Sequence, residues 1–248
     1  MTKIYALLAV SMLCVGCLKN SKPSDSLVMC TNPTYPPYES IDSNGKPVGF
    51  DVDMAEAITQ QLKKKLVIKE MAFDSLILGL EQGKCDFVLS GMSITPTRQK
   101  EITLLPYQGE PIKSYYLLFW NKKPVGIEQL KNKTIAVQSG TWMQNYLDTV
   151  QDITSKALDS TPELVLDIQY GKSAAAFVEP HILRDLLPKQ PHIKAIEIPL
   201  PESAWNLGNG IGIKKSNTKL AQEIQTALDS IKKSGLSDQL EKKWLHKQ

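Results

Sequence analysis

One short stretch of this sequence carries the chemistry of an anion-binding loop. Residues 90–98 contain serine and threonine hydroxyls, a glycine that allows close approach of the backbone, and Arg98 at the end. Backbone N–H groups and hydroxyls can donate to one side of a carboxylate, while the guanidinium of Arg98 donates two parallel hydrogen bonds to the other. The stretch therefore predicts a carboxylate site. The alternative is an ordinary strand-to-helix turn with a solvated arginine.

A second loop, Asn32–Tyr38, is rich in aromatic residues and proline. Apolar runs predict strands at 27–30, 66–70 and 86–89, and apolar periodicity predicts helices over 53–65 and from after Phe73 to Gly83. Alternating strands and helices favour a parallel sheet, and ligands bind at the carboxyl ends of such strands. Both loops follow a predicted strand, so we expect them to face one site.

The same pattern then restarts. Strands are expected at 114–120, 134–137, 174–178 and 194–198, and helices at 127–130, 142–150, 161–170 and 181–187. Gln138–Thr141 and Glu179 fall at the carboxyl ends of two of these strands. A last strand at 208–213 and two helices have no sheet of their own, so we assign them to the first unit. The prediction is an α/β protein of two lobes: residues 27–109 and 208–248, with 113–204 inserted, joined by hinges near 109–113 and 202–207.

The first 17 residues have the pattern of a bacterial lipoprotein signal. Lys3 precedes an apolar run, Ile4–Val15, that is too short to span a bilayer. Gly16 directly before Cys17 resembles a lipobox, which makes Cys17 the expected lipidated residue. Residues 18–26 read as a flexible tether. We therefore expect an exported protein of the periplasm or cell envelope, held to a membrane by its lipid alone. A plain secretory signal cut nearby is the alternative.

Composition argues against several other classes. The net charge of +3 over 248 residues comes from scattered lysines and arginines, whereas a nucleic-acid binder usually concentrates its charge in a stripe. The three histidines are dispersed and no cluster has metal-ligand spacing, so no metal is expected. Export would permit a disulfide between Cys30 and Cys85. Their predicted places at opposite ends of parallel strands instead favour two free core thiols.

Several collinear motifs resemble the polar amino-acid binding proteins of ABC importers. They are Gly49–Ala55, Phe73–Ile77, Ser90–Glu101 and Gly208–Gly212, and the resemblance covers nearly all of the chain after residue 26. Thr31–Asn32, Tyr35–Pro37 and Leu200–Trp205 are similar to arginine-binding lipoproteins of this family. The resemblance implies the two-lobed periplasmic-binding-protein (Venus-flytrap) fold. It also implies a monomer without cofactor that captures a free amino acid in its cleft and delivers it to a membrane permease.

The resemblance also implies roles for individual residues. Arg98 would bind the ligand carboxylate with help from Ser93 and Thr141. Glu179, where many relatives have Asp, would bind the α-ammonium with Ser90 and Gly91. Tyr35 and Phe73 would flank the side chain of the ligand. The full implied set is Asn32, Tyr35, Phe73, Ser90, Gly91, Met92, Ser93, Arg98, Gln138, Thr141 and Glu179.

The resemblance makes arginine the first choice of ligand. A guanidinium can also stack on aromatic faces such as Tyr35 and Phe73. Asn32 and Gln138 offer no countercharge, which leaves glutamine or another polar amino acid as the alternative. More remote alternatives are a surface interaction protein and an enzyme such as a dehydratase. For the enzyme, Glu179 and Glu39 are the available acid–base candidates, and a salt bridge explains Glu179 more simply.

Overall fold

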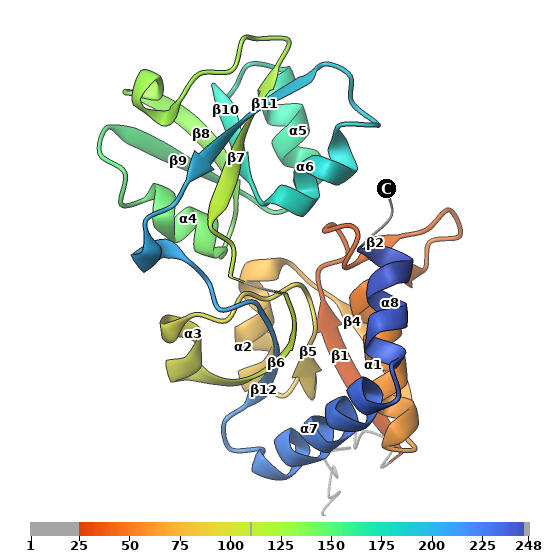
Figure 1. The fold of residues 1–248 in the computed structure, drawn as a ribbon. Helices are drawn as coiled ribbons and strands as arrows, with labels where there is room; N and C mark the ends of the chain where they lie inside the picture. The colour runs from red at the N-terminus through yellow and green to blue at the C-terminus, as the bar shows by residue number, and fades with distance from the viewer. Residues whose placement is uncertain (1–24, 110, 246–248) are drawn as a thin grey trace, which may run out of the picture.

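In a computed structural model of the chain, residues 25–109 and 111–245 are described, and they form two α/β lobes (Figure 1). The predicted signal over 1–17, with Cys17, lies outside the described residues, and so does the expected tether up to residue 24. The last residue of the expected tether, Ser26, begins the first strand instead. No helix in the part of the chain that the structure describes has the length and apolarity to span a membrane.

The first lobe is built on a five-stranded sheet in the order β4-β1-β5-β12-β6. β1 pairs in parallel with β4 and β5, and β12 pairs antiparallel with β5 and β6. The strands are β1 (Ser26–Thr31), β4 (Lys65–Glu70), β5 (Phe87–Val88), β6 (Ile102–Gln108) and β12 (Asn209–Lys214). Around them lie the hairpin β2 (Ser40–Ile41) and β3 (Pro47–Val48), and α1 (Phe50–Gln61), η1 (Phe73–Ser75), α2 (Leu76–Glu81), α3 (Pro96–Glu101), α7 (Thr218–Lys233) and α8 (Leu236–Trp244).

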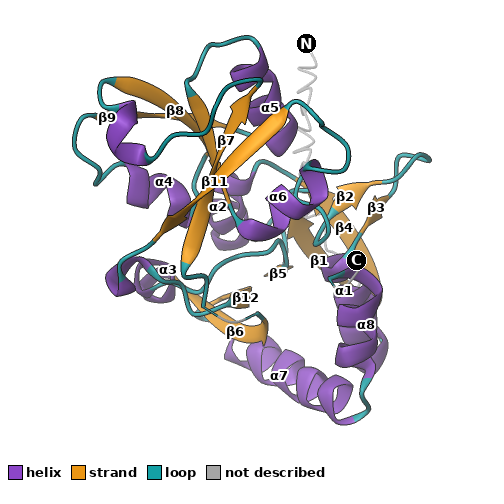
Figure 2. Ribbon diagram, turned by 45° about the horizontal axis from the view of Figure 1, so that its top comes forward, coloured by secondary structure: helices purple, strands orange, loops and turns teal. Residues whose placement is uncertain are grey.

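The second lobe has its own five-stranded sheet, in the order β11-β7-β10-β8-β9. β8, β9 and β10 run in parallel, and β7 pairs antiparallel with β10 and β11. The strands are β7 (Ser114–Trp120), β8 (Lys133–Gln138), β9 (Ile153–Leu158), β10 (Ala175–Val178) and β11 (Ile193–Pro199). The helices are η2 (Ile127–Leu130), α4 (Trp142–Leu147), α5 (Thr161–Gln169), α6 (Pro180–Leu186) and η3 (Glu202–Ala204), and they flank the sheet (Figure 2). The chain crosses between the sheets twice, after β6 and before β12.

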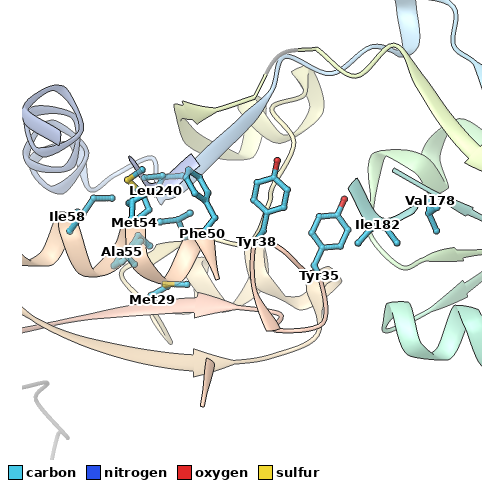
Figure 3. Packing of buried hydrophobic residues seen from close by; sticks show 14 of the residues in the cluster. Met29, Tyr35, Tyr38, Phe50, Met54, Ala55, Ile58, Val178, Ile182 and Leu240 are labelled. Atoms are coloured by element: carbon cyan, nitrogen blue, oxygen red, sulfur yellow. The ribbon is translucent and has the colours of Figure 1, made fainter. Parts of the chain in front are cut away.

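Apolar packing holds the strands that carry the site loops. In α7, Leu220, Ile224 and Leu228 share one buried face, as their spacing predicts. They join a core cluster with Met29 of β1 and Phe50 of α1, part of which is drawn in Figure 3. Since the middle of β1 is packed on this core, the loop that follows it starts from a fixed point.

Besides the hairpin of β2 and β3 and the short η3, three larger elements were not expected, namely β6, β9 and α3. β6 and β9 both lie at the edges of their sheets, where a strand has fewer buried neighbours. No residue of β9 is fully buried, and its half-buried and exposed residues do not alternate cleanly, which explains the weak apolar signal. The helix α3 occupies the end of the predicted anion loop, because Thr95 caps it and Pro96 opens it. The expected helix over 53–65 begins earlier, at Phe50, and ends at Gln61.

The prediction of two free thiols is wrong, because Cys30 and Cys85 form a disulfide with their Cα atoms 5.7 Å apart. The prediction assumed that Cys85 opens a strand of ordinary length. β5 instead comprises only Phe87–Val88, and Val88 pairs with Cys30. Cys85 lies just before this short strand, so it is close enough to Cys30 to form the bond. Both cysteines lie in one apolar cluster with Leu76 and Leu80 of α2.

Candidate functional site

Loops from the two lobes meet at one small cavity. β1 and β5 of the first lobe, and β8 and β10 of the second, are each followed by a loop that reaches it. The cavity measures about 10 Å³, which is at most the space of a single water molecule. It is lined by Tyr35, Phe73, Gly91, Ser93, Arg98, Gln138, Thr141, Trp142 and Glu179.

Arg98 provides the positive charge of the site. Thr95 accepts a hydrogen bond from the Arg98 backbone, which places the side chain at the first turn of α3. Its Nη1 donates to the Ser93 carbonyl at 2.8 Å, and its Nη2 crosses to the second lobe and donates to the Gly140 carbonyl at 2.9 Å. The guanidinium carbon lies 5.3 Å from the centre of the Phe73 ring. Burial lowers the pKa of Arg98 to about 10, so it remains charged at neutral pH.

Glu179 provides the opposing negative charge from the second lobe. It directly follows β10, and Pro180 is the first residue of α6. Its carboxylate accepts a hydrogen bond from the Tyr35 hydroxyl of the first lobe. Burial raises the pKa of Glu179 to about 7, although the hydrogen bond from Tyr35 and the charge of Arg98 both act to lower it. Nδ1 of the neighbouring His181 lies 3.6 Å from the carboxylate, and burial with the charge of Arg184 lowers the pKa of this imidazole to about 3, so it is neutral.

Two amides bridge the lobes beside the cavity. Gln138 Nε2 donates to Asn32 Oδ1 at 3.2 Å, and Asn32 Nδ2 donates to the Met71 carbonyl at 3.1 Å. Thr34 donates to the same Asn32 oxygen at 2.6 Å. This cluster is polar and uncharged, as the sequence predicts for these two side chains.

Two glycines are required for close approach. Gly91 has a φ of 51°, and a Cβ at this position would lie 3.0 Å from the Tyr35 ring. Gly140 has a φ of 71°, and its Cβ would lie 2.7 Å from Cα of Asp74 in the other lobe. A side chain at Gly140 would therefore hold the lobes apart.

Of the remaining residues of the predicted set, Thr141 lines the cavity, whereas Ser90 and Met92 do not. Ser90 accepts a hydrogen bond from the Asn32 N–H at 3.0 Å and donates to Glu39 at 2.8 Å. Thr141 caps α4 and donates to the Gln138 carbonyl. The side chain of Met92 packs in the apolar cluster around the disulfide, and its carbonyl accepts a hydrogen bond from the Gly210 N–H at 2.9 Å.

The structure brings three residues to this region that are not in the predicted binding set, although Glu39 was named as an acid–base candidate for the alternative of an enzyme. Trp142 lines the cavity and donates from Nε1 to the Ala204 carbonyl at 2.7 Å; its place directly after Thr141 was the available signal. Glu39 and Asp51 are buried behind the Ser90–Gly91 backbone. In the sequence, Asp51 gives no sign of a role beyond the start of a helix, because no local pattern pairs it with Glu39.

The profile of the bacterial extracellular solute-binding proteins of family 3 matches residues 27–247. The chain belongs to this family. Its relatives include the protein named "Probable ABC transporter arginine-binding protein ArtJ" of Chlamydia trachomatis. The two sequences are 42% identical over 248 residues, which cover 98% of this chain and 96% of the relative. The predicted resemblance to a polar amino-acid binding family, and within it to arginine-binding proteins, is thereby confirmed.

Solved structures of arginine-binding proteins share the two-lobed fold, which confirms the predicted fold class. One is a Salmonella typhimurium periplasmic binding protein described for its high arginine specificity. It is 30% identical, with a TM-score of 0.83 over 89% of this chain and 99% of that chain. Another is an ancestral arginine-binding protein bound to glutamine, 29% identical, with a TM-score of 0.82 over 91% of this chain and 100% of that chain. Solute-binding proteins of this family work outside the cytoplasm with an ABC importer.

Proposed function

We propose that this protein binds L-arginine between its lobes and delivers it to the permease of an ABC importer. The observation that carries the proposal is the pairing of opposite charges across one buried cavity. Arg98 on the first lobe matches an α-carboxylate, and Glu179 on the second matches an α-ammonium. Because every free amino acid presents these two groups, the pair supports recognition of the backbone end of the ligand.

The specificity of the site rests with the aromatic rings and the amides. A guanidinium can stack on the rings of Tyr35 and Phe73, and each well-placed contact contributes about 0.5–2 kcal/mol. The oxygens of Asn32 and Gln138 can accept hydrogen bonds from it. Relatives named for arginine support this choice. The uncharged amides and the glutamine-bound ancestral protein favour glutamine as the second candidate.

Binding requires the lobes to separate and close again. A cavity of about 10 Å³ cannot hold an amino acid, so a ligand must displace the bonds that join Tyr35 to Glu179 and Arg98 to Gly140. In the closed protein the ligand would contact both lobes, whereas in the open protein it would contact only one. The ligand therefore binds the closed form more tightly and shifts the population toward closure. We assign the moving bodies to residues 27–109 with 208–248, and to 113–204. The hinges are near 109–113 and 202–207.

The same proposal includes the remaining sequence-based predictions. The protein acts as a monomer without a cofactor, is exported, and is held to the membrane by a lipid on Cys17. It is a binding protein and not an enzyme: Glu179 is engaged with Tyr35 and faces Arg98, which suits a salt bridge more than acid–base chemistry.

Calorimetric titration tests the function directly. The protein is first unfolded and refolded to remove any ligand that co-purifies. It is then titrated with arginine, lysine, histidine and glutamine. We expect micromolar or tighter binding of arginine and weaker binding of the others. Absence of binding for all four would refute the amino-acid assignment, and glutamine binding more tightly than arginine would refute the choice of arginine.

A further inference from the structure

Two buried carboxyls lie behind the loops that carry the ligand contacts. Glu39 follows the Asn32–Tyr38 loop, and Asp51 lies in the first turn of α1. Both side chains are fully buried, and among the described residues neither forms an ion pair with a lysine or arginine. Two adjacent negative charges in a buried site repel strongly, so the pair holds a proton.

The hydrogen-bond partners show which carboxyl carries that proton. Asp51 accepts two donors, the Gly91 N–H at 2.6 Å and the Tyr107 hydroxyl at 2.7 Å, as an ionised carboxylate does. Glu39 Oε1 accepts the Ser90 hydroxyl, whereas no N–H or O–H of the residues that the structure describes donates to its Oε2. Asp51 is the neighbouring hydrogen-bonding group. Burial raises the pKa of Asp51 to about 7, although its hydrogen bonds from Gly91 and Tyr107 act to lower it. Burial and the charge of Asp51 raise the pKa of Glu39 well above its usual value. Above pH 7, Glu39 is therefore the carboxyl that holds the proton and can donate it to Asp51.

This pair is connected to both ligand loops. Asp51 fixes the N–H of Gly91, which lines the cavity, and Glu39 fixes the hydroxyl of Ser90. Ser90 in turn accepts the N–H of Asn32 from the other loop. We propose that Glu39, as a protonated carboxyl donating to ionised Asp51, is a positioning residue that holds the two ligand loops in their binding geometry.

Loss of this proton would uncouple the loops. Ionised Glu39 cannot donate, and it places a second charge beside Asp51. Burial and the neighbouring Asp51 raise the pKa of Glu39 well above its usual value, so the proton is retained at neutral pH. The other titratable groups facing the pair are Tyr107 of β6 and Tyr38, and burial raises the pKa of both phenols, so they stay neutral. Ligand affinity should therefore fall on the alkaline side, by up to about tenfold per pH unit.

Glu39→Gln tests the proposal, because an amide can donate to Asp51 and accept from Ser90 without titrating. Arginine affinity is measured by calorimetry from pH 6 to pH 10 in the wild type, in Glu39→Gln and in Glu39→Ala. We expect the alkaline loss in the wild type to be absent from Glu39→Gln, while Glu39→Ala binds more weakly at every pH. The α-ammonium of arginine also titrates in this pH range. Its effect is the same for all three proteins, so it cancels when their dissociation constants are compared as ratios. Glu56→Gln, an exposed carboxyl of α1, is the matched control and should follow the wild type.

The inference rests on the proposed function, so a second readout is independent of ligand. A carboxyl whose folded pKa is raised stabilises the protein at low pH, and that contribution is lost as pH rises through the folded pKa. The melting temperature of Glu39→Gln should therefore exceed that of the wild type at pH 9 and match it at pH 5. Parallel melting profiles, or an equal alkaline loss of affinity in the two proteins, would overturn the role of Glu39. Failure of the wild type to bind any amino acid would instead refute the proposed function. The comparison of melting temperatures would then still test the protonated state of Glu39 beside Asp51.

Discussion

The protonation of Glu179 should control the affinity for the ligand between pH 5 and pH 8. Burial raises the pKa of this carboxyl to about 7, and only its ionised form can pair with the α-ammonium. About 90% of the side chains are ionised at pH 8 and about 1% at pH 5. The dissociation constant should therefore rise about 100-fold over this range on acidification. The carboxylate and ammonium of the ligand stay charged throughout.

Glu179→Gln removes the charge but keeps an oxygen that can accept from the Tyr35 hydroxyl. A hydrogen bond to a charged group contributes about 1.5–3 kcal/mol, so this variant should bind about 10- to 150-fold more weakly at pH 8. At pH 5 its affinity should approach that of the wild type, because wild-type Glu179 is then protonated as well.

Proton release gives a more direct assay. Titrations at pH 6 in buffers of different ionisation enthalpy count the protons exchanged on binding. The wild type should release about 0.9 proton per arginine, which is the fraction of Glu179 protonated one unit below its pKa of about 7. Glu179→Gln should release none. An equal acid-side slope or equal proton release in the two proteins would refute the assignment of Glu179 to the ammonium.

Three further outcomes follow from single contacts. Arg98→Ala should weaken arginine binding at least 100-fold, since the ligand carboxylate would be left without its bidentate donor, and calorimetry measures this loss. Gly140→Ala should reduce affinity at least tenfold and give a larger radius of gyration with ligand in small-angle scattering, because its Cβ would meet Asp74 at 2.7 Å. Cys30→Ser with Cys85→Ser should lower stability by about 2–4 kcal/mol, since the disulfide closes a loop with a sequence separation of 55, and denaturant unfolding measures it.

Each of these changes has a control within the chain. Lys100→Ala, an exposed cation of α3, should leave arginine binding unchanged, and retained affinity in Arg98→Ala would refute the carboxylate assignment. Gly171 shares the positive φ of Gly140 but has no atom within 4 Å of its Cβ position. If Gly171→Ala reduced affinity as much as Gly140→Ala, backbone strain and not lobe contact would be the cause. Unchanged stability of the double serine variant would show that the disulfide does not constrain the unfolded chain.

Most residues of the candidate site could be brought together from the sequence, because their placement depends on local order along the chain. Arg98, Gln138 and Glu179 each follow a recognisable apolar strand, and the carboxyl ends of parallel strands share one edge of a sheet. The distance between lobes does not have a local signature. That Arg98 reaches Gly140, or that Gly140 touches Asp74, depends on how two separately folded bodies meet.

The errors have the same origin. The disulfide was excluded on an assumed strand length, and the true pairing is set by the register of β1 with the short β5. The pairing of Glu39 with Asp51 was not predicted, because no local pattern in the sequence brings these two carboxyls together. Burial of both in the same place follows only from the packing of the loop against α1.

The position of β12 in the first sheet imposes an order on folding. This strand lies between β5 and β6, yet its residues, Asn209–Lys214, come after the whole second lobe. A chain that emerges from its N-terminus therefore leaves β5 and β6 without the partner that joins them, while every strand of the second sheet is already available. The inserted lobe can become native first. The first sheet can be completed only after the last forty or so residues are available. Until then β5 and β6 each have an unpaired edge that could pair with an incorrect strand.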